Sequence, residues 1–293
     1  MSLKAFSDCR EGILKSLGKN QNDIDADLVI LKDWIRKQPH LPPSLLEENK
    51  FLEILLMRNK FSIEKTKSRI ENYCSLKIKY KYLFEDVQGV LNAQGPQFYY
   101  TIDKATENFE RVVISKITDE QNYDIVKDLG QGLMVLDLLS RFEYSTGDIF
   151  IIDLTECSAQ IATKLRLNAL FDAVTFSIKA YSCHTKEFHV INKTASSFLN
   201  FIKPLIPARY HEQIYAHESL DSLKDSVSPK YLPKDYGGEL KSLAEMRADW
   251  DIILKENHEL MQASLKTVSR EELRVGDVRM DSLPGTFRKL AVD

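Results

Sequence analysis

Continuous apolar runs alternate with helical segments through the second half of the chain. The longest run, GDIFIIDL at residues 147–154, is followed by a long amphipathic segment at 161–182. Further strands are expected at 188–192 and 213–217, with a very apolar helical segment at 197–206 between them. A strand that is apolar on both sides is typical of a parallel sheet covered by helices. This order of elements predicts an α/β core with right-handed crossovers.

The first 83 residues contain helical periodicity and no strand pattern. One helix is expected to begin at a cap on Asn22 or Asp23 and to end at the proline-rich residues 39–43. A second helix is expected at 44–59, and a third begins with Ser62 as its N-cap and runs to about residue 79. These helices predict a small all-helical bundle.

The remaining segments complete the expected domain organisation. Strands are expected at 96–100 and 111–115, and residues 119–142 are mainly helical with an interruption or restart near 130–132. A mixed-charge helix at 241–265 precedes an extended tail, which three apolar residues would hold against the domain: Leu283, Phe287 and Leu290. We therefore divide the chain into a helical bundle at 1–83, an α/β domain at 84–245 and a C-terminal helix with an extended tail at 246–293.

The apolar segment at 197–206 is unusual because its apolar residues cover most of the helical circumference: Phe198, Leu199, Phe201, Ile202, Leu205 and Ile206. Two interpretations remain open. The segment is a helix buried in the domain or in a dimer contact, or it is a movable lid over an apolar cavity that opens at a membrane. In the second case the wall and floor of the cavity comprise Phe150, Ile152, Leu154, Phe171, Val174, Ile178 and Val190.

Composition narrows the classes of function. Hydrophobic residues make up 43% of the 293 residues, which supports a folded core, and the net charge of −3 argues against general nucleic-acid binding. The sequence has no signal peptide and no apolar window long enough to span a membrane. Four cysteines without CxxC spacing are expected to be reduced thiols. These features predict a cytoplasmic protein.

The sequence contains no strong motif for catalysis, metal binding or cofactor binding. The six histidines lack metal-binding spacing, and we expect His189 to be packed and hydrogen-bonded in a strand. The sequence has no GxSxG motif, and Gly130-Gln131-Gly132 lacks the third glycine of a dinucleotide-binding loop. Cys157 follows the end of a strand, but no base is evident beside it. We expect no catalytic residue, metal or cofactor, and an esterase that uses Cys157 is only a minor alternative.

A spaced set of motifs in the second half resembles the CRAL-TRIO lipid-binding family. The motifs are the IN of residues 191–192, the KP of 203–204, the H of 217 and the LPKDYGG of 232–238. Residues 51–56 and 60–67 resemble the helical CRAL-TRIO-N bundle of that family. Residues 31–35 with 39–42, and the tail at 285–290, are similar to insect members close to tocopherol- and retinal-binding proteins. The resemblance covers nearly the whole chain.

The resemblance implies a non-enzymatic carrier with a helical bundle followed by an α/β/α domain. A mostly parallel sheet is then the floor of a pocket for one lipid, and residues 197–206 are a mobile gate that opens transiently at a membrane. In the tocopherol-transfer branch a basic cluster binds a phosphoinositide, and its positions match His184, Lys186, Arg209 and Gln213 here. The second hypothesis is a lipid-sensing adaptor that recruits a protein partner when its pocket is occupied.

Overall fold

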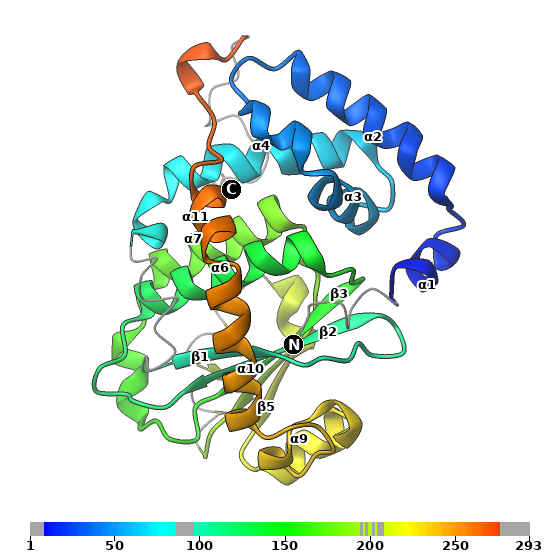
Figure 1. The fold of residues 1–293 in the computed structure, drawn as a ribbon. Coiled ribbons are helices and arrows are strands. Elements are labelled where there is room, and N and C mark those ends of the chain that lie inside the picture. The colour runs from blue at the N-terminus through cyan, green and yellow to red at the C-terminus, as the bar shows by residue number, and fades with distance from the viewer. Residues whose placement is uncertain are drawn as a thin grey trace, which may run out of the picture.

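The computed structural model describes residues 9–85, 97–193, 196, 199–200, 203 and 208–275 (Figure 1). A five-stranded sheet has the order β1-β2-β3-β4-β5. Strand β1 (Gln97–Thr101) pairs antiparallel with β2 (Glu110–Ile117). The following pairs are all parallel, from β2 to β3 (Gly147–Asp153), then β4 (Thr185–Ile191) and finally β5 (Ile214–His217). The predicted mostly parallel α/β core is confirmed.

Helices cover the two faces of this sheet with different completeness. On one face, strand residues form a continuous core with α9 (Leu220–Ser226) and α10 (Leu243–Glu256). This core includes Val112, Ile114, Ile149, Ile151 and Ile191 from the strands and Leu223, Met246 and Trp250 from the helices. Helices α6 (Ile125–Phe142) and α7 (Leu167–Tyr181) lie between the sheet and the N-terminal helices in Figure 1.

The N-terminal region consists of α1 (Cys9–Ser16), α2 (Gln21–Arg36), α3 (Asn49–Arg58) and α4 (Ile63–Lys79), with short 3₁₀-helices η2 (Pro43–Glu47) and η3 (Lys81–Phe84). Their apolar residues share one cluster with the small residues and Phe176 of α7. The cluster includes Leu31, Phe51, Leu55, Tyr73, Ala169, Ala173, Phe176 and Ala180. The predicted helical N-terminal region is therefore confirmed, and it packs directly on α7.

Several predicted boundaries were wrong. The cap of α2 is Asn20, whose side chain accepts from the backbone amide of Asp23 in a capping box. The helix expected at 44–59 is divided into η2 and α3 because residue 48 leaves helical geometry. Helix α6 begins only after Asp124, which caps it, and it continues through Gly130 without interruption.

The glycines of α6 permit close packing instead of breaking the helix. A Cβ atom at Gly130 would lie 2.1 Å from the carbonyl oxygen of Leu83, and one at Gly132 would lie 2.7 Å from the ring of Tyr99. The amphipathic segment expected at 161–182 is also divided, into η4 (Ala159–Lys164) and α7. The last predicted helix is divided at Asn257 into α10 and α11 (His258–Leu265).

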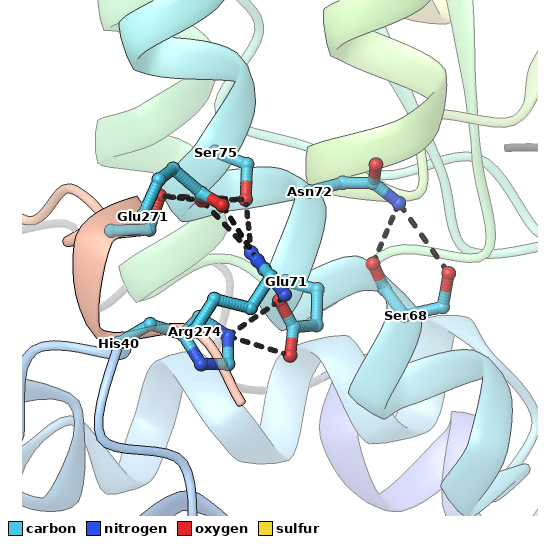
Figure 2. A network of polar contacts seen from close by, with 8 residues as sticks. His40, Ser68, Glu71, Asn72, Ser75, Glu271 and Arg274 are labelled. Carbon is cyan, nitrogen blue, oxygen red and sulfur yellow. Dashed lines mark hydrogen bonds and ion pairs between the residues drawn. The ribbon is translucent and has the colours of Figure 1, made fainter. Parts of the chain in front are cut away.

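The end of α11 and the segment that follows it contact α4 and connect the end of the described chain to the N-terminal helices. Lys77 donates to the backbone carbonyl of Ser264 over 2.7 Å. Farther along, Arg274 Nη1 lies 3.0 Å from Glu71 Oε2, which His40 Nε2 also approaches to 3.0 Å (Figure 2). The tail residues Leu283, Phe287 and Leu290 lie outside the described residues.

Candidate functional site

The sheet face opposite α9 and α10 has an apolar surface that is only half-buried. We call this surface the floor. Strand pairing aligns Phe150 with Phe188 and Phe188 with Ile214, so these side chains share one face across three strands. The next aligned set on that face contains Ile152, Val190 and Ala216. Val190 is fully buried, but the other five retain partial exposure. Because the central strands β3 and β4 normally bury such residues, the partial exposure of Phe150, Ile152 and Phe188 makes the floor the best candidate for a binding surface.

Part of the predicted lipid site forms a cluster at one end of the floor. Leu154 and Val190 are buried there with Leu199, the one residue of the predicted lid whose side chain contacts are described. Ile152 packs against the same cluster, and the rings of Phe150 and Phe188 approach to 6.3 Å between centroids. The predicted lid residues Phe198, Phe201, Ile202, Leu205 and Ile206 lie outside the described residues.

The structure adds residues to this end of the floor that the sequence did not indicate. They are Ile117, Tyr123, Ile125 and Ile161, all buried in the cluster with Leu154 and Val190. Phe188 and Ile214 were also missed, although both lie in predicted strands. Alternation along those strands was the available signal, since Phe188 and Val190 must share a face.

The predicted wall residues of α7 lie apart from this cluster. Phe171 and Val174 are 37% and 46% exposed, and Ile178 is half-buried. None of the three belongs to an apolar cluster formed by the described residues. The N-terminal helices cover the other side of α7. Phe171, Val174 and Ile178 are therefore available for a ligand, and their role in enclosing one stays a prediction.

Three of the predicted headgroup residues lie at the same edge of the sheet. His184 and Lys186 are at the start of β4, and Gln213 immediately precedes β5, whose first residue pairs with Phe188. His184 Nε2 lies 3.1 Å from the carbonyl oxygen of Arg58, and burial lowers the pKa of His184. The lowered pKa favours the neutral form of His184. Lys186 is exposed, and the side chain of Arg209 lies outside the described residues.

Arg58 is close to this edge but belongs to a buried ion network. Its Nη2 atom lies 2.7 Å from Asp148 Oδ2, and Arg111 forms an ion pair with the other carboxylate oxygen. Burial alone would raise the pKa of Asp148, but Arg111 and Arg58 outweigh it and hold that pKa at about 2. All three side chains are at most 2% exposed. Arg58 therefore connects α3 to β3 and is not accessible to a headgroup.

Groups with potential for chemistry have structural partners. His189 Nδ1 lies 2.8 Å from His217 Nε2, and His189 Nε2 lies 3.0 Å from Glu187, which confirms the predicted packed and hydrogen-bonded histidine. Burial and nearby acidic groups raise the pKa of Cys157 to about 11, so its thiol is not activated. Within the described ranges, no cluster of three metal-ligating side chains occurs, and no helix is long and apolar enough to cross a membrane.

A hollow of about 370 Å³ lies where β2 and β3 end. Three of its charged side chains contact one another: Lys116 lies 3.0 Å from Asp153 and 2.9 Å from Glu156. Tyr236 also donates to Asp153 over 2.7 Å. These internal contacts explain the polar residues of the hollow without a ligand, so the floor remains the better candidate.

In comparisons with known proteins, two separate segments of the chain match two different family models. Residues 113–238 match the CRAL/TRIO domain, and residues 20–88 match a model described as Pinta-like, UBA domain. No curated protein matches the chain. Among solved structures, the crystal structure of Sfh5 is similar with 10% identity and a TM-score of 0.47, over 82% of this chain and 98% of that one.

Proposed function

We propose that this chain, in which residues 113–238 match the CRAL/TRIO domain model, is a carrier for one hydrophobic lipid that it exchanges at membranes. The domain match supports lipid binding and transfer as the general function. The observation that carries the proposal is the half-buried floor, an apolar surface on β3, β4 and the edge strand β5 that consists of Phe150, Ile152, Phe188, Ile214 and Ala216. Candidate cargoes are tocopherols, retinoids, carotenoids and similar isoprenoids.

The energetics of such a cargo favour release at a membrane. Enclosing an isoprenoid removes roughly several hundred Å² of apolar surface from water, which is worth on the order of 10 kcal/mol at about 25 cal/mol per Å² before ordering costs. Release into water is then slow. Contact with a bilayer offers the cargo an equivalent apolar environment, and a gate at residues 197–206 would let it leave there.

A phosphoinositide trigger is the finer part of the proposal. Its support is the shared location of His184, Lys186 and Gln213 at the start of β4 and β5. Lys186 supplies the exposed positive charge in this group, because a lowered pKa favours the neutral form of His184, and Arg58 is paired with Asp148. We therefore expect weak headgroup binding that depends chiefly on Lys186 and Arg209.

An adaptor is the second candidate function, and one observation favours it. Helix α2 exposes two adjacent apolar side chains, Val29 at 67% and Ile30 at 48%. Both lie in the part of the chain that matches the Pinta-like, UBA domain model. An adaptor of this kind would bind a protein partner through α2 only when the floor is occupied by lipid.

Native mass spectrometry followed by organic extraction tests the carrier proposal. We expect one lipid per protein and uptake of retinol or α-tocopherol from phosphatidylcholine vesicles. Ile152→Trp fills the floor and should reduce uptake at least about tenfold, since overpacking a binding surface excludes ligand. Tyr215→Trp is the matched control, because Tyr215 is 39% exposed on the opposite face of the sheet.

Two outcomes would contradict the carrier proposal. One is a protein that is empty as purified and takes up neither compound. The other is equal uptake by wild type and Ile152→Trp, which would place the lipid away from the floor. Partner binding that requires lipid occupancy and is lost in Val29→Ser, with little transfer between vesicles, would favour the adaptor.

A further inference from the structure

The end of α4 and the short helix η3 present an exposed run in which basic and apolar residues alternate. Residues 77–82 read KIKYKY. Ile78 is 43% exposed and Tyr82 37%, and Lys79 and Lys81 are exposed between them. The run therefore carries two cations and two large apolar side chains into solvent.

Helix α7 extends this charged surface. It lies beside α4, because the apolar residues of the two helices share one buried cluster. Arg69 of α4 donates from Nη1 to the backbone carbonyl of Lys179 over 3.4 Å, and Lys179 lies half-buried in the last turn of α7. Burial and the positive charges of Lys79 and Arg69 lower the pKa of Lys179. These three cations are therefore neighbours on two adjacent helices.

The positive charges of this surface lack acidic partners. Among the described residues, four of its cations form no ion pair with a carboxylate: Arg69, Lys79, Lys81 and Lys179. The acid on the adjoining side of α7, Asp172, accepts a hydrogen bond from the hydroxyl of Tyr82 over 2.7 Å. Since the whole chain has a net charge of −3, these residues form a local excess of positive charge on a slightly acidic protein.

We propose that this basic surface, formed by Arg69, Ile78, Lys79, Lys81, Tyr82 and Lys179, is a docking site for an anionic bilayer. A cluster of about four or more lysine and arginine residues on a helix is attracted to anionic lipids. Apolar side chains among the cations enter the boundary between headgroups and acyl chains, and the amphipathic tyrosine ring suits that boundary. A bilayer accounts for both the cations and the apolar side chains, whereas an acidic protein accounts directly only for the cations.

The purpose of this docking rests on the proposed carrier function, because the basic surface adjoins the candidate lipid site. Phe171 follows the same side of α7 next to Asp172, is 37% exposed and belongs to the predicted wall of that site. Burial is the main cause of the lowered pKa of His184, and the charge of Arg69 adds to it, which places Arg69 near the predicted headgroup residues. A bilayer held by the basic surface would therefore lie close to both.

Flotation with vesicles tests the charged part of the inference. Wild-type protein is mixed with vesicles of phosphatidylcholine alone or of phosphatidylcholine and phosphatidylserine, without phosphoinositide. We expect binding that requires phosphatidylserine and weakens at high salt. Lys79→Glu/Lys81→Glu should weaken it at least about tenfold, since one charge near an anionic surface contributes about fivefold. Lys15→Glu/Lys255→Glu, at exposed positions on α1 and α10, is the matched control and should bind like wild type.

A second pair of variants tests the apolar part. Ile78→Ser should weaken binding to the phosphatidylserine vesicles severalfold, and this loss should persist at high salt because it removes an apolar contact. Val29→Ser is its control, since Val29 is 67% exposed on α2, and should bind like wild type. All four variants change exposed side chains, and circular dichroism confirms that each is folded.

The outcomes separate this inference from the carrier function, because affinity for retinol in solution is measured on the same proteins. Wild type that binds retinol but binds both vesicles equally or not at all would overturn the docking site and leave the carrier intact, as would equal losses in the two double variants. Binding to phosphatidylserine vesicles without retinol or other cargo would overturn the carrier alone. Polyglutamate binding as tight as vesicle binding, with no loss in Ile78→Ser, would assign the basic surface to an acidic protein and overturn the bilayer.

Discussion

The two faces of one sheet differ in how far they are covered. On β3, Ile149 and Ile151 point to α9 and α10 and are 6% and 0% exposed. Phe150 and Ile152 alternate with them, point to the floor side and remain half-buried. The same strand thus supplies a closed core on one side and an open apolar surface on the other. Complete burial indicates a role in stability, whereas incomplete burial of equally apolar residues indicates a role in binding.

Buried polar groups are paired on both faces. On the closed face, His189 and His217 satisfy each other and are completed by Glu187 and Ser222. On the floor face, the hydroxyl of Tyr123 donates to the buried carboxylate of Asp128 over 2.9 Å. Satisfied networks of this kind help to specify the fold. The contrast between the two faces therefore lies in their apolar residues.

The largest loss of stability is expected at the start of β3, where the buried Arg58–Asp148–Arg111 network lies. Asp148→Asn removes the charge that both Arg58 and Arg111 require, and we expect a loss of about 3–5 kcal/mol in the free energy of unfolding because two buried guanidinium groups lose their partner. Urea unfolding monitored by circular dichroism measures it. Asp33→Asn, whose pair with Lys37 is exposed, should leave the free energy of unfolding nearly unchanged. Similar losses in the two variants would contradict the structural role of the network.

The next largest effect is on the pH dependence of stability, which Asp128 controls through its raised pKa. Its pKa of about 7 is above its ordinary value of 3.8, so the folded state holds this proton more tightly than the unfolded chain does. The resulting stability is complete below about pH 4 and is lost as the pH rises through 7. Asp128→Asn removes that loss and should gain on the order of 3–4 kcal/mol relative to wild type between pH 4 and 8. Asp225→Asn, at an exposed position, should show no such gain.

Adjacent residues of β3 give the most direct comparison of the two faces. Ile151→Ala should cost about 2–4 kcal/mol because it leaves a cavity in a fully buried core. Ile152→Ala should cost about 1 kcal/mol in the cargo-free protein because half-buried side chains lose less contact. Lipid affinity should fall more in Ile152→Ala than in Ile151→Ala. Equal stability losses would mean that the floor is an ordinary core.

The sequence predicted the parallel sheet well. It did not predict which face of the sheet is only partly covered, and the reasons are physical. The parallel strands followed from their length and apolar character, and the helical start of the chain from spacing and caps. The openness of the floor was not predictable from β3, because GDIFIID is apolar on both sides and burial depends on what covers each face.

The same limit applies to the predicted headgroup residues. His184, Lys186 and Gln213 were placed in one cluster by resemblance, and strand pairing brings them to one edge. Their charges depend on neighbours distant in sequence: the Arg58 carbonyl contacts His184, and Asp148 binds the Arg58 guanidinium. Motif matching gives the positions of such residues, but the protonation and accessibility that decide their function come from the fold.

The smallest predicted effect tests whether the membrane trigger lies at the edge of the floor face. Lys186→Glu should slow transfer to acceptor vesicles that contain phosphatidylinositol 4,5-bisphosphate severalfold, with no change in the affinity for the bound lipid, because one exposed charge contributes about 1 kcal/mol near an anionic surface. Lys37→Glu, at the C-cap of α2 where the Lys37 side chain is 70% exposed, is the matched control and should have no effect. The difference should diminish at high salt, since screening weakens exposed charges. Identical transfer rates for the two variants would show that the bound lipid leaves the floor without a contribution from Lys186. Release would then depend on contact with the bilayer alone.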